Sequence, residues 1–186
     1  EPKLCAYVDM PLQHASDPIL KSMNRGTTQA GTRKLVYRLR DAVPNLTIRS
    51  SVIVGYPGET EDRFEEMLAF LEEMRFNRLV AFSYSHEENT AAGLLIDDVE
   101  EDVKVERINR VMEMQEAITT EITEAMIGQT MRVLIDRPSD DPDYDWVGRT
   151  RMDAPEIDGE VLIYGQGGRG LFADVDIVDA NGYDLI

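Results

Sequence analysis

Three segments rich in polar residues or glycine each follow a predicted strand, and they carry the side chains best suited to bind a ligand. Gln13 and His14 follow the first predicted strand, the loop from Gly55 to Thr60 follows the second, and residues 84–88 follow the third. In parallel α/β architectures, ligands bind beyond the carboxyl ends of the strands. The three segments therefore predict a ligand site at this edge of the sheet.

The loop Gly55 to Thr60 is the most informative of the three. Gly55 and Gly58 allow a ligand to approach the backbone closely, and Pro57 stiffens the loop. The exposed amides at the start of the following helix favour a carboxylate or another anion. The loop thus suits a nucleotide-like cofactor, although most glycine-rich turns of this kind only connect a strand to a helix.

Two histidines and one cysteine are the remaining reactive side chains. His14 and His86 each follow a predicted strand, where a histidine is more often a hydrogen-bonded structural group than a proton-transfer catalyst. Cys5 is the single cysteine. It excludes an internal disulfide, cannot by itself hold zinc or an iron–sulfur cluster, and is expected to be a buried thiol.

The elements that position these residues alternate between strand and helix. The predicted strands occupy 6–12, 48–54 and 79–84, and the predicted helices contain the segments starting at Asp17, Leu35 and Thr60. This alternation is typical of a parallel sheet or barrel built from β-α units. The β-branched run at 48–54 is expected to be covered on both faces.

The rest of the chain changes character twice. Residues 99–126 are charged and carry apolar side chains at helical spacing, so they predict a connecting helix. After Gly128 the sequence is rich in Val, Ile, Asp and Gly without a helical period, which predicts a small β-barrel of roughly five short strands. The predicted fold class is α/β plus all-β.

The composition restricts the possible partners. The 186 residues carry a net charge of −17, a field that repels phosphate backbones and attracts basic proteins, although acidity can also serve solubility alone. No apolar run approaches the length of a membrane span, and no secretory leader is visible at the start. We therefore expect a cytoplasmic protein without a membrane partner.

Several motifs resemble the radical-SAM methylthiotransferase family, in particular its branch that modifies a ribosomal protein. The segments that carry this resemblance are Pro11 to Ser16, Arg49 to Thr60, Tyr84-Ser85 and Gly148 to Gly159. The sequence departs from the family at His86, where proline is usual, and at Asn89, where glycine is usual. Both departures concern the shape of one loop.

The resemblance implies a specific architecture. Residues 1–98 would form the C-terminal part of a radical-SAM barrel, a TIM-barrel-like β/α barrel, and residues 99–127 would form a linking helix. Residues 128–186 would form a five-stranded, OB-like TRAM β-barrel. The family's cluster-binding cysteines should lie upstream of this sequence, so the chain alone is expected to be inactive and to generate no radical.

The resemblance also implies an activity. Family members of this branch attach a methylthio group to the β-carbon of an aspartate in ribosomal small-subunit protein twelve. The cofactors implied are S-adenosylmethionine and two 4Fe–4S clusters, whose ligands are absent from this sequence. Protein groups in such an enzyme chiefly position the reactants and exclude water. No catalytic side chain and no metal ligand is therefore assigned to this chain.

By position in the family motifs, five residues are expected at the cofactor. Gln13, Arg49 and Ser51 would face its polar parts, with Arg49 the candidate for its carboxylate, and the stretch from Ile53 to Gly55 would lie beside the adenine. Arg49 could equally be a surface arginine of the strand, and Ser51 a hydroxyl satisfied by backbone.

The C-terminal part carries the substrate expectation. From Ala125 to Ile186 there are thirteen acidic residues against five arginines and no lysine, whereas an RNA-binding barrel should show a basic stripe. We expect a basic protein as substrate and a docking edge at the acidic hairpin. Its candidate docking residues are Asp136, Asp140, Asp141, Asp143 and Asp145.

The partner expected from these arguments is ribosomal small-subunit protein twelve, either free or on the assembled small subunit, and nucleic acid is not expected as the direct target. Two alternatives stay open. One is a transfer-RNA methylthiotransferase, against which the charge argues. The other is a non-catalytic module in which the half-barrel only supports an acidic protein-binding domain, whose acidity can also be an ordinary solvated surface.

Overall fold

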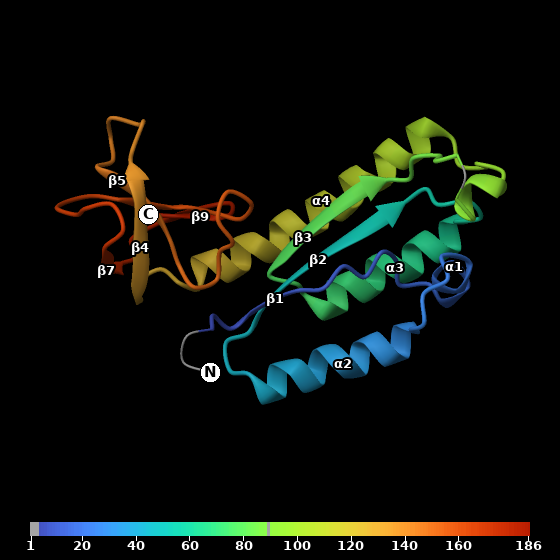
Figure 1. Ribbon diagram of the computed structural model, residues 1–186, viewed down its shortest axis with the longest axis horizontal. Helices are drawn as coiled ribbons and strands as arrows, with labels where there is room; N and C mark the ends of the chain where they lie inside the picture. Colours follow the sequence, from blue (N-terminus) through green and yellow to red (C-terminus); the bar gives the residue numbers. More distant parts are fainter. Residues whose placement is uncertain (1–3, 89) are drawn as a thin grey trace. The chain divides into compact units, whose positions relative to one another are not determined.

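The computed structural model describes residues 4–88 and 90–186. The chain divides into two compact units (Figure 1). One consists of Val8–Gln115, and the other joins Glu116–Ile186 to the described residues up to Tyr7. The division into 1–98, 99–127 and 128–186 stays a prediction, and the units are described separately below.

The first unit is built around a small sheet. Up to the long helix, the elements are β1 (Tyr7–Asp9), α1 (Asp17–Ser22), α2 (Gln29–Ala42), β2 (Thr47–Val54), α3 (Glu61–Met74), β3 (Arg78–Ser83), the 3-10 turn η1 (Ala92–Leu94) and α4 (Glu101–Glu124). The sheet order is β1-β2-β3, and β2 pairs with β3 in parallel. The predicted parallel β-α architecture is confirmed.

Strand β2 separates a buried face from a partly open one. Ile48, Ser50, Val52 and Val54 are buried, while Arg49, Ser51 and Ile53 on the opposite face are only half-buried. The expectation that this strand is covered on both faces was therefore wrong. Side chains alternate along a strand, so Ser51 and Ile53 share the open face, which borders a cavity.

The helices begin at the capping residues that the sequence offers. Thr60 precedes α3, its side chain accepts a hydrogen bond from the amide of Arg63, and acidic residues occupy the first turn. Helix α2 begins at Gln29, earlier than the predicted apolar pattern, because Thr28 caps it by accepting from the Gly31 amide. Figure 1 shows α2 and α3 running alongside the three strands.

The second unit is a small all-β domain. Its strands are β4 (Thr130–Pro138), β5 (Trp146–Arg149), β6 (Val161–Ile163), β7 (Phe172–Asp176), β8 (Ala180–Asn181) and β9 (Asp184–Leu185), in the order β7-β4-β5-β6-β9-β8. Strands β7 and β8 are successive parts of one segment, which pairs with β4 at one end and with β9 at the other. The sheet thus closes on itself through five segments.

The core of this domain comes from the inward face of its strands. Val133, Ile135, Val161 and Ile163 pack with Ile177 and Leu185, which come from the last two segments. The predicted fold class, α/β followed by a small β-barrel, is confirmed. Within the described residues, no helix is both long and apolar enough to cross a bilayer.

Candidate functional site

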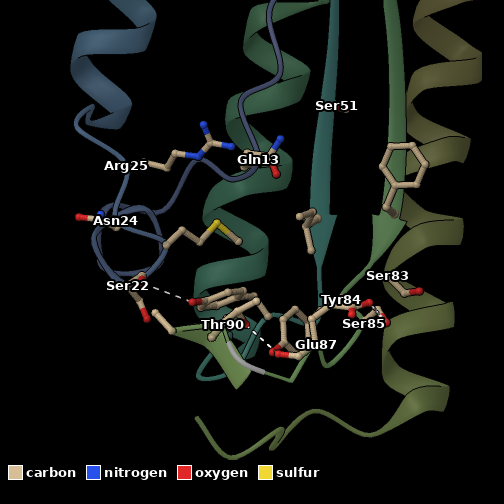
Figure 2. A pocket seen from close by; sticks show the side chains of 16 residues that line it. Gln13, Ser22, Asn24, Arg25, Ser51, Ser83, Tyr84, Ser85, Glu87 and Thr90 are labelled. Carbon is tan, nitrogen blue, oxygen red and sulfur yellow. Dashed lines mark hydrogen bonds between the residues drawn. The ribbon is translucent and has the colours of Figure 1, made fainter. Parts of the chain in front are cut away.

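A cavity of about 520 Å³ lies at the carboxyl ends of the three strand segments of the first unit. Figure 2 shows Gln13, Ser51 and Tyr84 reaching it from neighbouring segments. The lining residues are Gln13, Ser22, Met23, Asn24, Arg25, Ser51, Ile53, Tyr56, Phe82, Ser83, Tyr84, Ser85, Glu87, Thr90, Ala91 and Ala92. The cavity therefore gathers residues from all three segments that the sequence singled out.

Backbone pairing places the lining residues on β2 and its neighbours. Gln13 donates its amide to the Ser51 carbonyl at 3.0 Å and accepts from the Ile53 amide at 2.8 Å. On the other side of β2, Ile53 lies opposite Phe82 of β3, a residue that is 53% exposed. An amide, a hydroxyl and apolar side chains thus share the open face of the sheet.

One end of the cavity is aromatic. The rings of Tyr56 and Tyr84 meet edge to face with centroids 5.3 Å apart, and both residues are buried with Ile19. The Tyr56 hydroxyl donates to the Ser22 carbonyl at 3.3 Å. The Tyr84 hydroxyl is buried without a hydrogen-bond partner among the described residues. Its loss of hydration, followed by the effect of Tyr56, raises the pKa of Tyr84 above its usual value.

Tyr84→Phe is expected to leave the free energy of unfolding unchanged or to raise it by about 1 kcal/mol, because it removes a buried hydroxyl that has no partner. The matched control is Tyr56→Phe, which removes a hydrogen bond and should lower that free energy by about 1 kcal/mol. Urea unfolding followed by NMR signals of the first unit measures both. A clear loss of stability in Tyr84→Phe would show that its hydroxyl has a partner.

The other two predicted cofactor residues do not line the cavity. Arg49 is on the same face of β2 as Ser51, but its guanidinium Nη1 donates to Asp9 Oδ2 at 2.9 Å. Gly55 has the left-handed backbone that glycine adopts at no cost, with φ +72°, and its amide donates to the Glu59 carboxylate. The structure thus brings Gln13, Ser51 and Ile53 together and places Arg49 and Gly55 outside the cavity lining.

A buried polar network lies behind the cavity. The imidazole Nε2 of His14 is 3.1 Å from Glu59 Oε1, and both side chains are fully buried. Arg107 of α4 donates through Nη1 to Glu59 Oε2 at 3.2 Å and to the Glu59 carbonyl at 3.1 Å. Sequence reasoning missed this network, because Glu59 and Arg107 are separated by 48 positions and each is one charge among many.

The loop after β3 forms one wall of the cavity. Thr90 holds it, since its hydroxyl donates to the Glu87 carbonyl at 2.9 Å and accepts from the Gly93 amide at 2.9 Å. His86 is exposed in this loop. The other departure from the family pattern, Asn89, lies outside the described residues.

Cys5 is exposed, so the expectation of a buried thiol was wrong; it precedes β1 and lies outside the packed sheet. Among residues 4–88 and 90–186, no group of three or more His, Cys, Asp or Glu side chains is arranged to hold a metal ion. This part of the chain does not fit an iron–sulfur cluster.

The predicted docking hairpin of the second unit contains two kinds of carboxylate. Asp136 pairs with Arg149, and Asp145 accepts from the Gly165 amide at 2.6 Å. The tip is more available: Asp140, Asp141 and Asp143 are all exposed. Asp140 nevertheless lies 3.2 Å from Arg137, and Asp141 accepts from the Asp143 amide. The tip therefore presents the carboxylates freest to meet a partner.

Comparison with known proteins identifies both parts of the chain. The profile of the Radical SAM superfamily matches residues 3–71, and that of the TRAM domain matches residues 127–186. Escherichia coli coproporphyrinogen III oxidase (HemN), a solved radical SAM enzyme, covers 63% of this chain and 27% of its own with a TM-score of 0.49 and 19% identity, which is too distant to support an inference.

Curated relatives align along the chain's entire length. The protein named ribosomal protein uS12 methylthiotransferase RimO of Flavobacterium johnsoniae is 49% identical over 100% of this chain and 42% of its own. The proteins of the same name from Christiangramia forsetii and Heliobacterium modesticaldum are 48% and 47% identical, with 41% and 40% of their own lengths covered. The chain spans about two fifths of the length of these relatives. The chain thus matches the Radical SAM superfamily and the TRAM domain in its two parts and is similar along its whole length to proteins named as uS12 methylthiotransferases.

Proposed function

We propose that the chain forms part of a radical-SAM methylthiotransferase that modifies an aspartate of ribosomal protein uS12. Its first unit supplies part of the S-adenosylmethionine site, and its second unit docks the substrate. The observation that carries the proposal is the 49% identity to a uS12 methylthiotransferase along the whole chain. On the same ground we propose a cytoplasmic location, since the proposed substrate is a ribosomal protein.

The cavity has the properties that a nucleoside-bearing cofactor needs. Small-molecule sites are typically apolar clefts of about 300–1,000 Å³ with a few polar groups that fix orientation. Here the aromatic rings of Tyr56 and Tyr84 and the side chain of Ile53 offer apolar contact, while Gln13 and Ser51 offer hydrogen bonds. When bound and reductively cleaved in such enzymes, S-adenosylmethionine supplies the radical that abstracts a hydrogen from an unactivated carbon.

The residues of this chain contribute binding and orientation to that chemistry. Gln13, Ser51 and Ile53 hold the nucleoside part, and the aromatic end excludes water from it. Arg49 already donates through Nη1 to Asp9, so it would reach the cofactor carboxylate through its other N–H groups or by exchanging this bond. Gly55 acts through the backbone that it gives to the following loop. The 4Fe–4S clusters of the family belong to residues outside this chain.

Titration of the isotope-labelled chain with S-adenosylmethionine is expected to shift the NMR signals of Gln13, Ser51 and Ile53, because these residues share the cavity. Methionine alone is the control and should cause smaller shifts, since it lacks the nucleoside that the aromatic end would contact. Shifts confined to the second unit, or to Arg49 and Asp9, would contradict the assignment of this cavity.

The docking proposal rests on the exposed carboxylates of the hairpin tip. Replacing Asp140, Asp141 and Asp143 together by Asn is expected to weaken binding to uS12 by about tenfold at low salt and to reduce its salt dependence. The matched control changes three exposed acids of α4, Asp102, Glu113 and Glu116, to their amides. The equilibrium dissociation constants of the wild type and of both triple variants are measured for uS12, for the small ribosomal subunit and for transfer RNA.

The two substitution sets change the net charge equally, so a local docking site and general acidity predict different results. An equal loss of affinity for uS12 in both variants would mean that overall charge, and not a local docking site, causes the effect. Tighter binding of the chain to transfer RNA than to uS12 would favour a transfer-RNA methylthiotransferase instead. Binding to none of the three would overturn the docking role.

A further inference from the structure

Gln13 has an unusual backbone for a residue with a side chain. Its φ is +72°, in the left-handed region that favours glycine. The conformation is fixed on one side by β2, since the Gln13 amide and carbonyl both pair with that strand, at 3.0 and 2.8 Å. Observed strain of this kind is a starting point for a functional hypothesis, because the surrounding structure must maintain it.

The position of the Gln13 side chain suggests why the strained backbone is maintained. This side chain lines the cavity. Within residues 4–88 and 90–186, the side-chain amide of Gln13 makes no hydrogen bond, in contrast to its backbone amide. Glycine would adopt the same backbone without strain. The chain therefore keeps an amide side chain at a position where the backbone alone favours glycine, which indicates that the amide meets a ligand.

His14, the next residue, anchors the other side of the peptide that joins residues 13 and 14. The amide of Ser16 donates to His14 Nδ1 at 2.9 Å, so Nδ1 carries no proton and the proton of the neutral imidazole is on Nε2. Nε2 then donates to Glu59 Oε1 at 3.1 Å. Both ring nitrogens are satisfied, and the ring has no freedom to turn.

Glu59 is itself held rigidly. Its carboxylate accepts from Arg107 at 3.2 Å and from the Gly55 amide, and Arg107 is 4% exposed. Gln13 is thus fixed by β2, and His14 is fixed by a buried network that joins α4 to the loop after β2. The peptide that joins residues 13 and 14 therefore lies between two anchors.

We propose that His14 is a positioning residue of the cofactor site: through its Nε2–H bond to Glu59 it holds Gln13 in the left-handed conformation and directs the Gln13 amide into the cavity. Without the imidazole anchor, the backbone at residue 13 relaxes to an ordinary negative φ and the amide leaves the cavity. The proposal concerns a contact to S-adenosylmethionine and so rests on the proposed function.

The test uses the isotope-labelled 186-residue chain and three variants. His14→Leu removes the anchor, His14→Gln replaces it by an amide donor, and Gln13→Gly keeps the backbone but removes the side chain. Two quantities are measured by NMR in each protein. The first is the intraresidue contact between the amide and α protons of residue 13, which is strong only at positive φ. The second is the dissociation constant for S-adenosylmethionine.

His14→Leu is expected to lose the positive-φ signature at Gln13 and to bind S-adenosylmethionine about fivefold more weakly, the usual effect of one lost hydrogen bond. His14→Gln should retain both properties to within about twofold, since its amide can still donate to Glu59. Gln13→Gly should bind as weakly as His14→Leu, although its Tm stays within about 3 °C of the wild type because relief of strain offsets the flexibility of glycine.

The two measurements separate this proposal from the proposed function. A positive-φ signature that persists in His14→Leu overturns the positioning role, whether or not the cofactor binds. Wild-type affinity in Gln13→Gly overturns the contact between the amide and the cofactor. If S-adenosylmethionine shifts no signal of the wild-type cavity, the proposed function of this cavity fails, while the signature at residue 13 still decides the role of His14.

Discussion

Glu59→Ala is expected to lower the free energy of unfolding of the first unit by about 3–5 kcal/mol, the loss typical of breaking a buried ion pair by removing one partner. Arg107 is buried and would lose its bond at 3.2 Å, keeping only the Glu61 carboxylate, 3.0 Å from its Nη2, as an ion-pair partner. His14 and the Gly55 amide would lose their acceptor in the same step. Urea unfolding followed by NMR signals of Val8–Gln115 measures the change.

Two further variants make the cause of this loss testable. Glu59→Gln keeps an acceptor but removes the charge, so it should fall between Glu59→Ala and the wild type. Glu73→Ala removes a carboxylate that pairs with Arg33 at the surface, 2.9 Å away, and should change stability little. Equal effects of Glu59→Ala and Glu73→Ala would mean that the buried network contributes no more than a surface ion pair.

The sequence predicts the architecture because architecture depends on local patterns. The β-branched run before Gly55 and the apolar stripe after Thr60 each fix an element, and alternation of strand and helix implies a parallel sheet. The helix predicted to start at Thr60 is confirmed, and the Thr60 side chain caps it. Once the sheet is parallel, the segments after its strands must meet at one edge, and the cavity lies there.

Side-chain partners depend on tertiary contacts that no local pattern encodes. Arg49 was expected at the cofactor carboxylate, but its Nη1 donates to Oδ2 of Asp9, forty positions earlier, at 2.9 Å. From the local sequence, Glu59 would be expected to be a solvated acid before a helix. Helix α4 instead buries it beside Arg107. Gln13 carries no signal of its left-handed backbone, because its conformation is imposed by β2 and His14.

The barrel of the second unit shows the same limit. Its valines, isoleucines and glycines predict roughly five short strands, and the sheet has six, of which β7 and β8 lie in one segment of the chain. Closure itself depends on a long-range pairing, in which residues 172–181 join β4 to β9. The pairing of Asp136 with Arg149 and of Asp145 with the Gly165 amide likewise comes from packing, and it leaves the tip of the hairpin as the available part.

Gly55→Ala is expected to lower the free energy of unfolding by about 2–5 kcal/mol, through two separate effects. A left-handed backbone costs a residue with a side chain about 1–2 kcal/mol, and φ at position 55 is +72°. In addition, a Cβ atom there would overlap Lys104 Cγ and lie 2.9 Å from its Cδ, and overpacking of this kind costs about 1–3 kcal/mol. Denaturation by urea, monitored on the first unit, measures the sum.

Lys104 cannot move away easily, which is why the steric part of this prediction is large. Its side chain is 5% exposed and begins on α4, and its Nζ is held by Asp97 at 2.7 Å. Gly58→Ala is the matched control: φ is +81° there, but the nearest atom to a Cβ is Arg63 Nη1 at 3.6 Å, so only the backbone cost of about 1–2 kcal/mol applies. Equal losses in the two variants would mean that Lys104 yields freely, and the packing of α4 against the loop would then not fix Gly55 in place.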